Sequence, residues 1–416
     1  IKKSSYTILT FIIAGIFVFN CNSIWTALPN ANNKTSYLCL VIVSVLVLLI
    51  NKIKLDNLVY LLSISAIVGI YGLIYGIVSD FSSSLLILIT LAIIFILLIG
   101  QGESIVFDIL SKYSWLIVVI AAISIIFWIF GSNLKWIKPT GTVLSTWASG
   151  SNYYSRGVAD VVPSYFGIYF ETQTVSGLSF FSNMIRNTAI FTEAPMASLN
   201  FSLALLINIY YRQKIKRSNL KNFILILAIL TTFSTTGYIL LVLLGFSYLF
   251  YSKNKLIIKY RNILLPVLGI IFILVIFVLF NQKLNYDTGS SSIRSDDYKV
   301  GYQAFKDHPI LGLGLANNML LVQNYMENWR SYNTGLSSSV VELFSFGGLY
   351  LGFPYIFSFI RGIFLSIKNK NKEKMFFVLM TLYLFILTIF TFKYITIFLL
   401  VWFGLSSSHR YKKIYK

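Results

Sequence analysis

Residues 294–318 read RSDDYKVGYQAFKDHPILGLGLANN and form a long polar segment in a chain that is 57% hydrophobic. The segment carries charged side chains at Arg294, Asp296 and Asp297, followed by His308. Because charged side chains are costly to place in lipid, such a segment must face water or line a cavity. It therefore marks one surface of a membrane protein, and the apolar blocks on either side of it are the parts that cross the membrane.

The composition of the whole chain supports this interpretation. The mean hydropathy is +0.77, and 12% of residues are charged, against about 25% in a typical soluble domain. Many apolar runs approach the ~20 residues that cross a bilayer as a helix, so we predict an all-α polytopic membrane protein with about 12 transmembrane helices in one integral membrane domain, residues 1–416. The expected spans are residues 6–20, 36–50, 57–78, 85–99, 115–130, 196–211, 223–234, 238–251, 262–280, 336–367, 375–392 and 394–407.

The net charge of +20 does not indicate nucleic-acid binding. Lysines and arginines stand in short clusters between the apolar runs, as they do in the cytoplasmic loops of membrane proteins. Their distribution places both termini in the cytoplasm and two long loops, residues 131–195 and 281–335, outside. Lys2 and Lys3 precede the first apolar run, which we interpret as an uncleaved first span. The two cysteines form no CxxC pattern and no disulfide framework.

The two outside loops are longer than ordinary connections, and loops of this length are usually functional or disordered. The first loop is rich in aromatic residues, which either stack on sugars or belong to the aromatic belt at the membrane interface. In the second loop, Tyr298, Tyr302 and Phe305 recur at helical spacing. This spacing predicts a short amphipathic helix lying on the membrane surface or on the helix bundle.

Residues 186–198, RNTAIFTEAPMAS, lead into a central span from outside. Pro195 is a normal residue for the first turn of a helix. One interpretation makes Arg186 an interfacial anchor and Glu193 a residue that interacts with the helix dipole. The other makes Arg186 an anion ligand and Glu193 an acid or base in a cavity.

The polar segment that opened this section ends in Asp307-His308-Pro309, with Gly312 and Gly314 close behind. His308 either orders a turn or acts as a base. The glycines allow a tight turn whose backbone amides are free to approach a ligand, or they pack the turn on the bundle. Glu342 lies inside an apolar helix, where ionisable groups are rare. The run Ser234–Gly237 interrupts an apolar stretch and predicts a hairpin or a broken helix.

Arginines at one membrane face suit pyrophosphate, because a guanidinium group binds phosphate oxygens in pairs and keeps its charge. No DxD, HExxH or Cys/His set indicates a metal site, so neither a metal nor a cofactor is expected.

Four stretches resemble motifs of the bacterial O-antigen polymerase (Wzy) and O-antigen ligase superfamily. RNTAIFTEAPMAS is similar to the pattern R-x-x-G-x-F-x-E-P, except that Ala189 replaces the glycine and Ala194 separates Glu193 from Pro195. FSTTGYILL is similar to S-x-x-G-Y, and SSSVVELFSFGGLYLG is similar to L-x-E-x-G-x-x-G. The polar segment 294–318 resembles the hallmark loop, an arginine followed by P-l-G-x-G and an asparagine.

The resemblance implies a GT-C-like helical fold and transfer of an undecaprenyl-pyrophosphate-linked glycan without a metal and with inversion. It also implies a place in the bacterial plasma (inner) membrane, with the active site at the periplasmic or outer face. The partners would be lipid-linked oligosaccharide repeat units and the lipid bilayer, with a chain-length regulator and a flippase as further candidates. The implied roles are pyrophosphate binding for Arg186 and Arg294, general base for Glu193, His308 or Asp297, and loop shaping for Pro309, Gly312 and Gly314.

Two rival functions stay open at this stage. In the ligase branch of the superfamily, a His-Asn pair precedes the last motif helix, whereas Asn333 and Thr334 stand about there in this chain. This difference favours a polymerase over a ligase acting on lipid A-core. A lipid-linked oligosaccharide flippase or other transporter should show two matching halves, and we find no internal repeat.

Overall fold

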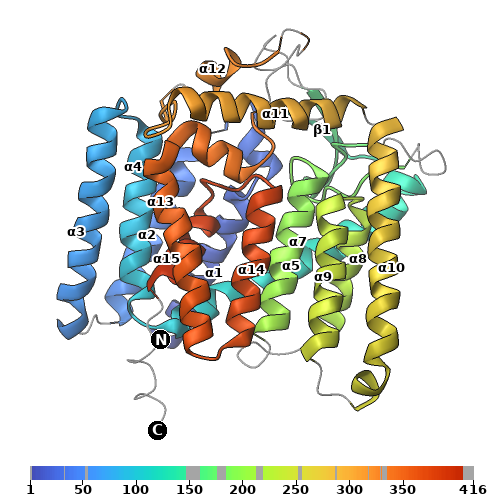
Figure 1. The fold of residues 1–416 in the computed structure, drawn as a ribbon, viewed down its shortest axis with the longest axis horizontal. Helices are drawn as coiled ribbons and strands as arrows, with labels where there is room; N and C mark the ends of the chain where they lie inside the picture. The colour runs from blue at the N-terminus through green and yellow to red at the C-terminus, as the bar shows by residue number, and fades with distance from the viewer. Residues whose placement is uncertain are drawn as a thin grey trace.

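The structure is a computed structural model that describes residues 2–31, 33–51, 55–146, 160–175, 184–211, 219–251, 255–285, 288–316, 318–327, 329 and 335–405. Helices dominate, and most of them run side by side in one bundle (Figure 1). The bundle helices are α1 (Lys2–Asn20), α2 (Asn33–Asn51), α3 (Leu55–Val78), α4 (Ser83–Ile99), α5 (Glu103–Phe127), α7 (Ala194–Tyr210), α8 (Asn219–Thr231), α9 (Thr235–Tyr251), α10 (Lys255–Asn285), α13 (Ser339–Lys368), α14 (Lys372–Leu387) and α15 (Tyr394–Leu405).

Each stretch that we predicted to cross the membrane coincides with one of these helices. Large apolar side chains point outward, among them Leu49, which is 70% exposed, and Ile77, which is 79% exposed. Several shorter apolar helices accompany the long ones, so the protein is a multi-pass membrane protein. The total of about 12 spans stays a prediction, as does the GT-C-like architecture. Among the described residues, four segments are long and apolar enough to cross a bilayer: Asn33–Asn51, Leu58–Val78, Glu103–Asn133 and Ser339–Lys368.

The two long loop regions lie at the same end of the bundle. Figure 1 shows helix α11 (Thr288–Asp307), helix α12 (Asn318–Gln323) and strand β1 at one end, and the start of helix α1 at the other. We call the first of these ends the α11 face. The sequence predicts this face to be the outer one, and that assignment to a side of the membrane stays a prediction.

Helix α7 is the central element of the bundle and packs against α5, α8, α9 and α14. All of its side chains from Leu199 to Ile207 are buried. Within this run, Asn200 accepts a hydrogen bond from the Tyr113 hydroxyl at 2.7 Å and donates one to the carbonyl of Cys21 at 3.3 Å. A helix that is apolar and buried on all sides is held by its neighbours. The bundle therefore fixes the position of the α7 N-terminus at the α11 face.

A small sheet in the first long loop departs from the all-α prediction. Strands β1 (Gly141–Ser145), β2 (Asp160–Tyr165) and β3 (Tyr169–Phe170) pair antiparallel in the order β1-β2-β3. Val143 stands opposite Val162, and β-branched residues favour such paired positions.

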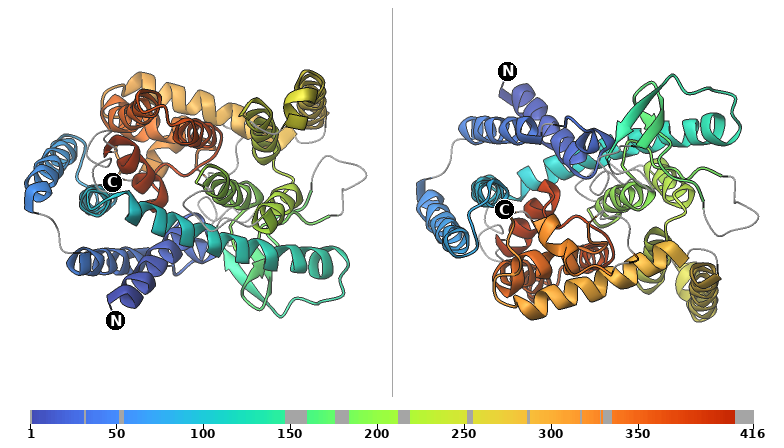
Figure 2. Two further views of the ribbon diagram at one scale, coloured as in Figure 1. Left: turned by 90° about the horizontal axis from the view of Figure 1, so that it is seen from below. Right: turned by 90° about the horizontal axis from the view of Figure 1, so that it is seen from above.

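Helix α11 lies across the end of the bundle, as Figures 1 and 2 show. The sequence predicted a helix on the membrane surface or on the bundle; α11 packs on the bundle, with Tyr298 and Tyr302 directed away from it, 48% and 67% exposed. Gly301 explains which side of α11 meets the bundle, since a Cβ at this position would overlap Val341 of α13. Small residues let two helices approach closely, which bulky tyrosines would prevent. The buried face of α11 consists of Asp296, Asp297, Val300, Gly301 and Ala304.

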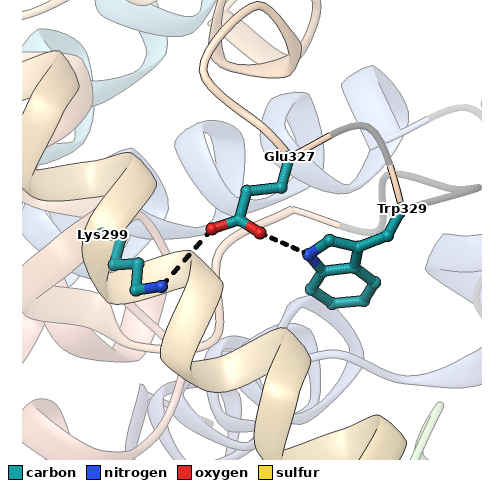
Figure 3. Close-up of polar contacts among 3 residues, drawn as sticks. All are labelled: Lys299, Glu327 and Trp329. Atoms are coloured by element: carbon teal, nitrogen blue, oxygen red, sulfur yellow. Dashed lines mark hydrogen bonds and ion pairs between the residues drawn. The ribbon is translucent and has the colours of Figure 1, made fainter.

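The segment after α12 folds back onto the exposed side of α11 (Figure 3). The Trp329 indole donates a hydrogen bond to Glu327 at 2.7 Å, and the Lys299 ammonium lies 3.4 Å from the other carboxylate oxygen. The hydrogen bond from the indole, followed by the hydrogen bond and charge of the lysine, holds the pKa of Glu327 below its ordinary value. Both charged side chains are at least half exposed, so this ion pair contributes little to stability.

Candidate functional site at the α11 face

Arg186 is anchored at the turn between α8 and α9. Its Nε donates to the carbonyl of Thr232 at 2.9 Å, and a terminal guanidinium nitrogen donates to the carbonyl of Phe233 at 3.1 Å. A cation is favourable at these carbonyls because they lie at the negative end of the α8 dipole. Arg186 is half-exposed, and Tyr238 of α9 lies within its electrostatic reach. The side chain is therefore held in place at the α11 face.

The α8–α9 turn agrees with the predicted interruption at Ser234–Gly237. Helix α8 ends at Thr231 and α9 begins at Thr235. Gly237 brings α9 close to α7, because a Cβ there would overlap the Ser198 hydroxyl. The turn thus sets the carbonyls that hold Arg186 against the central helix.

Gln173 joins Arg186 to the start of α7. The backbone N–H of Arg186 donates to the Gln173 carbonyl at 2.9 Å, and the Gln173 side chain accepts from the backbone N–H of Ala194 at 2.9 Å. Glu193 is the residue before α7, is half-exposed, and precedes Pro195 in the first turn as predicted. The structure therefore brings Arg186 and Glu193 to one corner, although sequence reasoning did not single out Gln173.

Ala189 has a backbone conformation that explains its place in the motif. Its φ is +50°, a value that costs an L-residue about 1–2 kcal/mol and costs glycine nothing. This is the position at which the resembled pattern carries glycine. The Ala189 carbonyl accepts a hydrogen bond from Phe170 N–H at 3.0 Å. This bond joins the segment that precedes α7 to strand β3 of the small sheet.

We expect Ala189→Gly to relieve this strain and Ala197→Gly, in α7, to weaken the helix. Both alanines are fully buried, so both variants lose the same methyl group. Because glycine costs about 1 kcal/mol inside a helix and gains about 1–2 kcal/mol at positive φ, Ala189→Gly should be the more stable variant by ~2 kcal/mol. Thermal unfolding of the two purified proteins measures the difference, and equal losses would contradict the strain.

Arg294 and Asp297 lie on the side of α11 that faces the bundle. Arg294, Asp297 and Gly301 recur at spacings of three and four, so they share one face of the helix. Arg294 is half-exposed, while Asp296 and Asp297 are 3% and 1% exposed. Buried carboxylates are costly unless they have partners. This side of α11 therefore brings a cation and two acids to the end of the bundle.

His308 lies at the other end of α11, in the turn that follows the helix. Its backbone N–H donates to the Ala304 carbonyl at 3.0 Å, and its own carbonyl accepts from Gly312 N–H at 2.9 Å. Pro309 follows and cannot extend the helix. The His308 side chain is exposed, and the helical rise of ~1.5 Å per residue places it about 20 Å from Arg294. The structure does not bring these two candidates together.

The backbone amides after Pro309 bond to a break in α13. Leu313 N–H donates to the Ser345 carbonyl at 2.8 Å, and Gly314 N–H donates to the Phe346 carbonyl at 2.9 Å. These carbonyls are available because Gly348, with φ +56°, interrupts the helix. The expectation that the amides are free to approach a ligand is therefore wrong. The alternative from the sequence, a turn packed on the bundle, describes this segment.

Glu342 stands in the first turn of α13, with the Thr391 side chain in hydrogen-bonding reach and Lys393 in electrostatic reach. Both partners belong to the loop between α14 and α15. This loop is fastened to α13, because Ser339 Oγ donates to the Thr388 carbonyl and accepts from Phe390 N–H, both at 2.7 Å. Glu342 is therefore part of a polar cluster at the α11 face.

Lys393 was not predicted as a site residue. A lone lysine in the apolar run TFKYITIFLL was the available signal, because ionisable residues in such runs are rare and mark functional positions. Its partner could not be inferred, since Glu342 lies far away in the sequence.

Within the part of the chain that the structure describes, no group of three or more His, Cys, Asp or Glu residues could hold a metal ion. Asn333 and Thr334, which the sequence comparison places about where the ligase branch has its His-Asn pair, lie outside the described residues.

A multi-pass helical membrane protein with arginines and carboxylates at one end of its bundle is the class that the fold and the site define. The Wzy_C family model, described as O-antigen ligase, matches residues 222–356. This match confirms the resemblance to the O-antigen polymerase and ligase superfamily over less than half of the chain. It includes Arg294, His308 and Glu342, and it excludes Arg186 and Glu193. Comparisons with curated proteins and with solved structures found no match.

Proposed function

We propose that this protein is a surface-polysaccharide polymerase, which transfers the growing undecaprenyl-pyrophosphate-linked glycan onto the next lipid-linked repeat unit. The observation that carries the proposal is the O-antigen ligase match over residues 222–356, since this stretch contains α11 and its Arg294. The enzyme would lie in the bacterial plasma membrane with the α11 face outside. Both substrates are lipid-linked, which suits an active site at the membrane surface.

The proposed reaction forms one glycosidic bond and breaks one bond to phosphate. A hydroxyl oxygen of the incoming repeat unit attacks the anomeric carbon of the growing chain from the side opposite the pyrophosphate, and the configuration inverts. The hydroxyl proton passes to a general base, and undecaprenyl pyrophosphate departs with the electron pair of the broken bond. Arg294 and Arg186 would neutralise the charge that develops on this leaving group, and fixed charges of this kind are a main source of catalysis.

Glu193 is the general base that the geometry supports best. It is half-exposed at the corner that Gln173 shares with Arg186, so an acceptor hydroxyl can reach it beside a pyrophosphate ligand. Asp297 is almost fully buried, and His308 lies about 20 Å from Arg294 along α11. These placements make Asp297 a candidate for positioning Arg294 and His308 a candidate for ordering the turn.

The ligase reaction is the second candidate, because the matching family model carries that description. The polymerase is preferred because Asn333 and Thr334 stand about where the ligase branch has His-Asn. A gene deletion separates the two functions. Loss of a polymerase leaves single repeat units attached to the lipid A-core, whereas loss of a ligase leaves none attached.

Polymerisation in vitro tests the proposal directly. We expect the purified protein, mixed with undecaprenyl-pyrophosphate-linked repeat units and a metal chelator, to produce a ladder of longer lipid-linked glycans on a gel. Transfer that occurs only when lipid A-core is supplied would identify a ligase. A ladder that disappears with the chelator would contradict the metal-independent mechanism.

A further inference from the structure

An apolar groove of about 400 Å³ runs down one side of the bundle, between the α3–α4 pair and helices α13 and α15. Its walls are apolar side chains such as Val68 of α3, Ala92 of α4, Leu351 of α13 and Leu400 of α15. Figure 1 shows α3 at the edge of the molecule, where it packs along α4. The groove is thus a space between an outlying helix and the body of the bundle.

Two tyrosines join α3 to α13 at the end of the groove nearer the α11 face. The Tyr71 hydroxyl donates to the Tyr350 carbonyl at 2.6 Å, the Tyr350 hydroxyl donates to the Tyr71 carbonyl at 2.9 Å, and their rings stack at 4.2 Å. One turn further along α3, the Tyr75 hydroxyl shares its hydrogen between the carbonyls of Leu311 and Phe346, at 2.8 and 2.9 Å. The end of α3 nearer the α11 face is therefore hydrogen-bonded to α13 and to the loop after α11.

Arg361 of α13 is the cation in the lining of the groove, at the end away from those tyrosines. It lies ten residues after Leu351, which is about 15 Å along a helix and matches one leaflet of a hydrocarbon core ~30 Å thick. In the described part of the chain its contacts are uncharged, namely the Gly404 carbonyl and the Phe357 ring, 5.8 Å away. A guanidinium at this level of the helix can pair with an anionic headgroup at the membrane surface.

We propose that this groove binds a phospholipid with an anionic headgroup from the leaflet remote from the α11 face. One acyl chain fills the space between α3 and α13, and the phosphate accepts hydrogen bonds from the Arg361 guanidinium. Length, apolar lining and a single cation at one end match this occupant, since basic positions between transmembrane helices bind anionic lipid headgroups. The bound acyl chain packs the end of α3 remote from the α11 face against the bundle, as the tyrosines do for the end nearer that face. This proposal does not depend on the proposed enzymatic function.

Mass spectrometry of the intact protein, purified in mild detergent and mixed with phosphatidylglycerol or phosphatidylethanolamine, tests the site. We expect the unmodified protein to retain one phosphatidylglycerol about fivefold more often than phosphatidylethanolamine, the preference that one cation near the membrane surface supplies. Arg361→Gln should lose this preference and still retain lipid. Lys368→Gln, an exposed change on the same helix outside the groove, should keep it.

A paired variant tests whether the chain lies in the groove. Val68 lines the groove, whereas its neighbour Ile67 is 67% exposed on the outside of α3. Val68→Trp should abolish lipid retention, and Ile67→Trp should not. Equal retention in both variants would overturn the proposal. Recovery of a polyprenyl lipid instead of a phospholipid from the purified protein would also overturn it, because the groove would then hold the tail of a substrate.

Discussion

Cells whose only copy of the gene carries Arg294→Ala are expected to lose long-chain glycan while keeping normal amounts of the protein. Arg294 is half-exposed on the face of α11 that meets the bundle, so its loss removes a charge from the site with little loss of packing. If the guanidinium stabilises the departing pyrophosphate, its removal should lower the transfer rate at least about a hundredfold. Gel analysis of glycan length and an immunoblot of membranes measure the two quantities.

Two further variants show whether the lost charge is responsible. Arg294→Lys keeps the charge and loses the paired hydrogen bonds, so it should retain part of the activity. Lys299→Ala removes a cation from the exposed side of the same helix, where Lys299 pairs with Glu327, and should leave chain length unchanged. A normal ladder of chain lengths with Arg294→Ala would contradict the role of Arg294.

Gly312→Ala is expected to destabilise the protein by about 2–5 kcal/mol, from a strained backbone together with overpacking. Gly312 has φ +66°, and a Cβ there would lie 2.5 Å from the carbonyl carbon of Phe346 and 2.7 Å from the nitrogen of Gly348. Those atoms are backbone and cannot rotate away. Gly348→Ala should have a similar effect, because its Cβ would overlap the Ile310 carbonyl. Thermal unfolding of the purified protein and its yield in membranes measure the loss.

Gly167→Ala is the matched control for the backbone strain. Gly167 has φ +68°, and nothing lies within 4 Å of its expected Cβ. This variant should therefore cost only the ~1–2 kcal/mol of the left-handed conformation. If Gly167→Ala and Gly312→Ala lower the melting temperature equally, the close contact between the turn and α13 adds nothing to the destabilisation by Gly312→Ala.

Local features of the sequence predicted the helices well. Runs of apolar residues mark where α3 or α13 lies, because a membrane helix must present apolar side chains along its whole length. Pro195 marked the start of α7, and the polar interruption near Ser234 marked the turn between α8 and α9. The charged segment 294–318 was predicted to lie at a bundle end, because charged side chains are costly to place in lipid. Each of these signals is contained within one stretch of chain.

Sequence-based prediction was incomplete or wrong where a feature depends on contacts between two segments that are far apart in the chain. The spacing of Tyr298 and Tyr302 predicted the helix but left open the surface on which it lies, and the fit of Gly301 against Val341 packs α11 on the bundle. The glycines after Pro309 suggested amides available to a ligand, and the break at Gly348 supplies carbonyls that occupy them. In both cases the deciding atoms belong to α13.

Hydropathy, charge and motif spacing by themselves determined that this is a multi-pass helical membrane protein with a polar segment at one surface and a resemblance to glycan-transferring enzymes. Only the tertiary structure decided that Arg186 and Glu193 share a corner through Gln173, that Lys393 lies near Glu342, and that His308 is remote from Arg294. The physical reason is that span formation depends on transfer of neighbouring residues into lipid, whereas a site depends on packing between segments that are far apart in the chain.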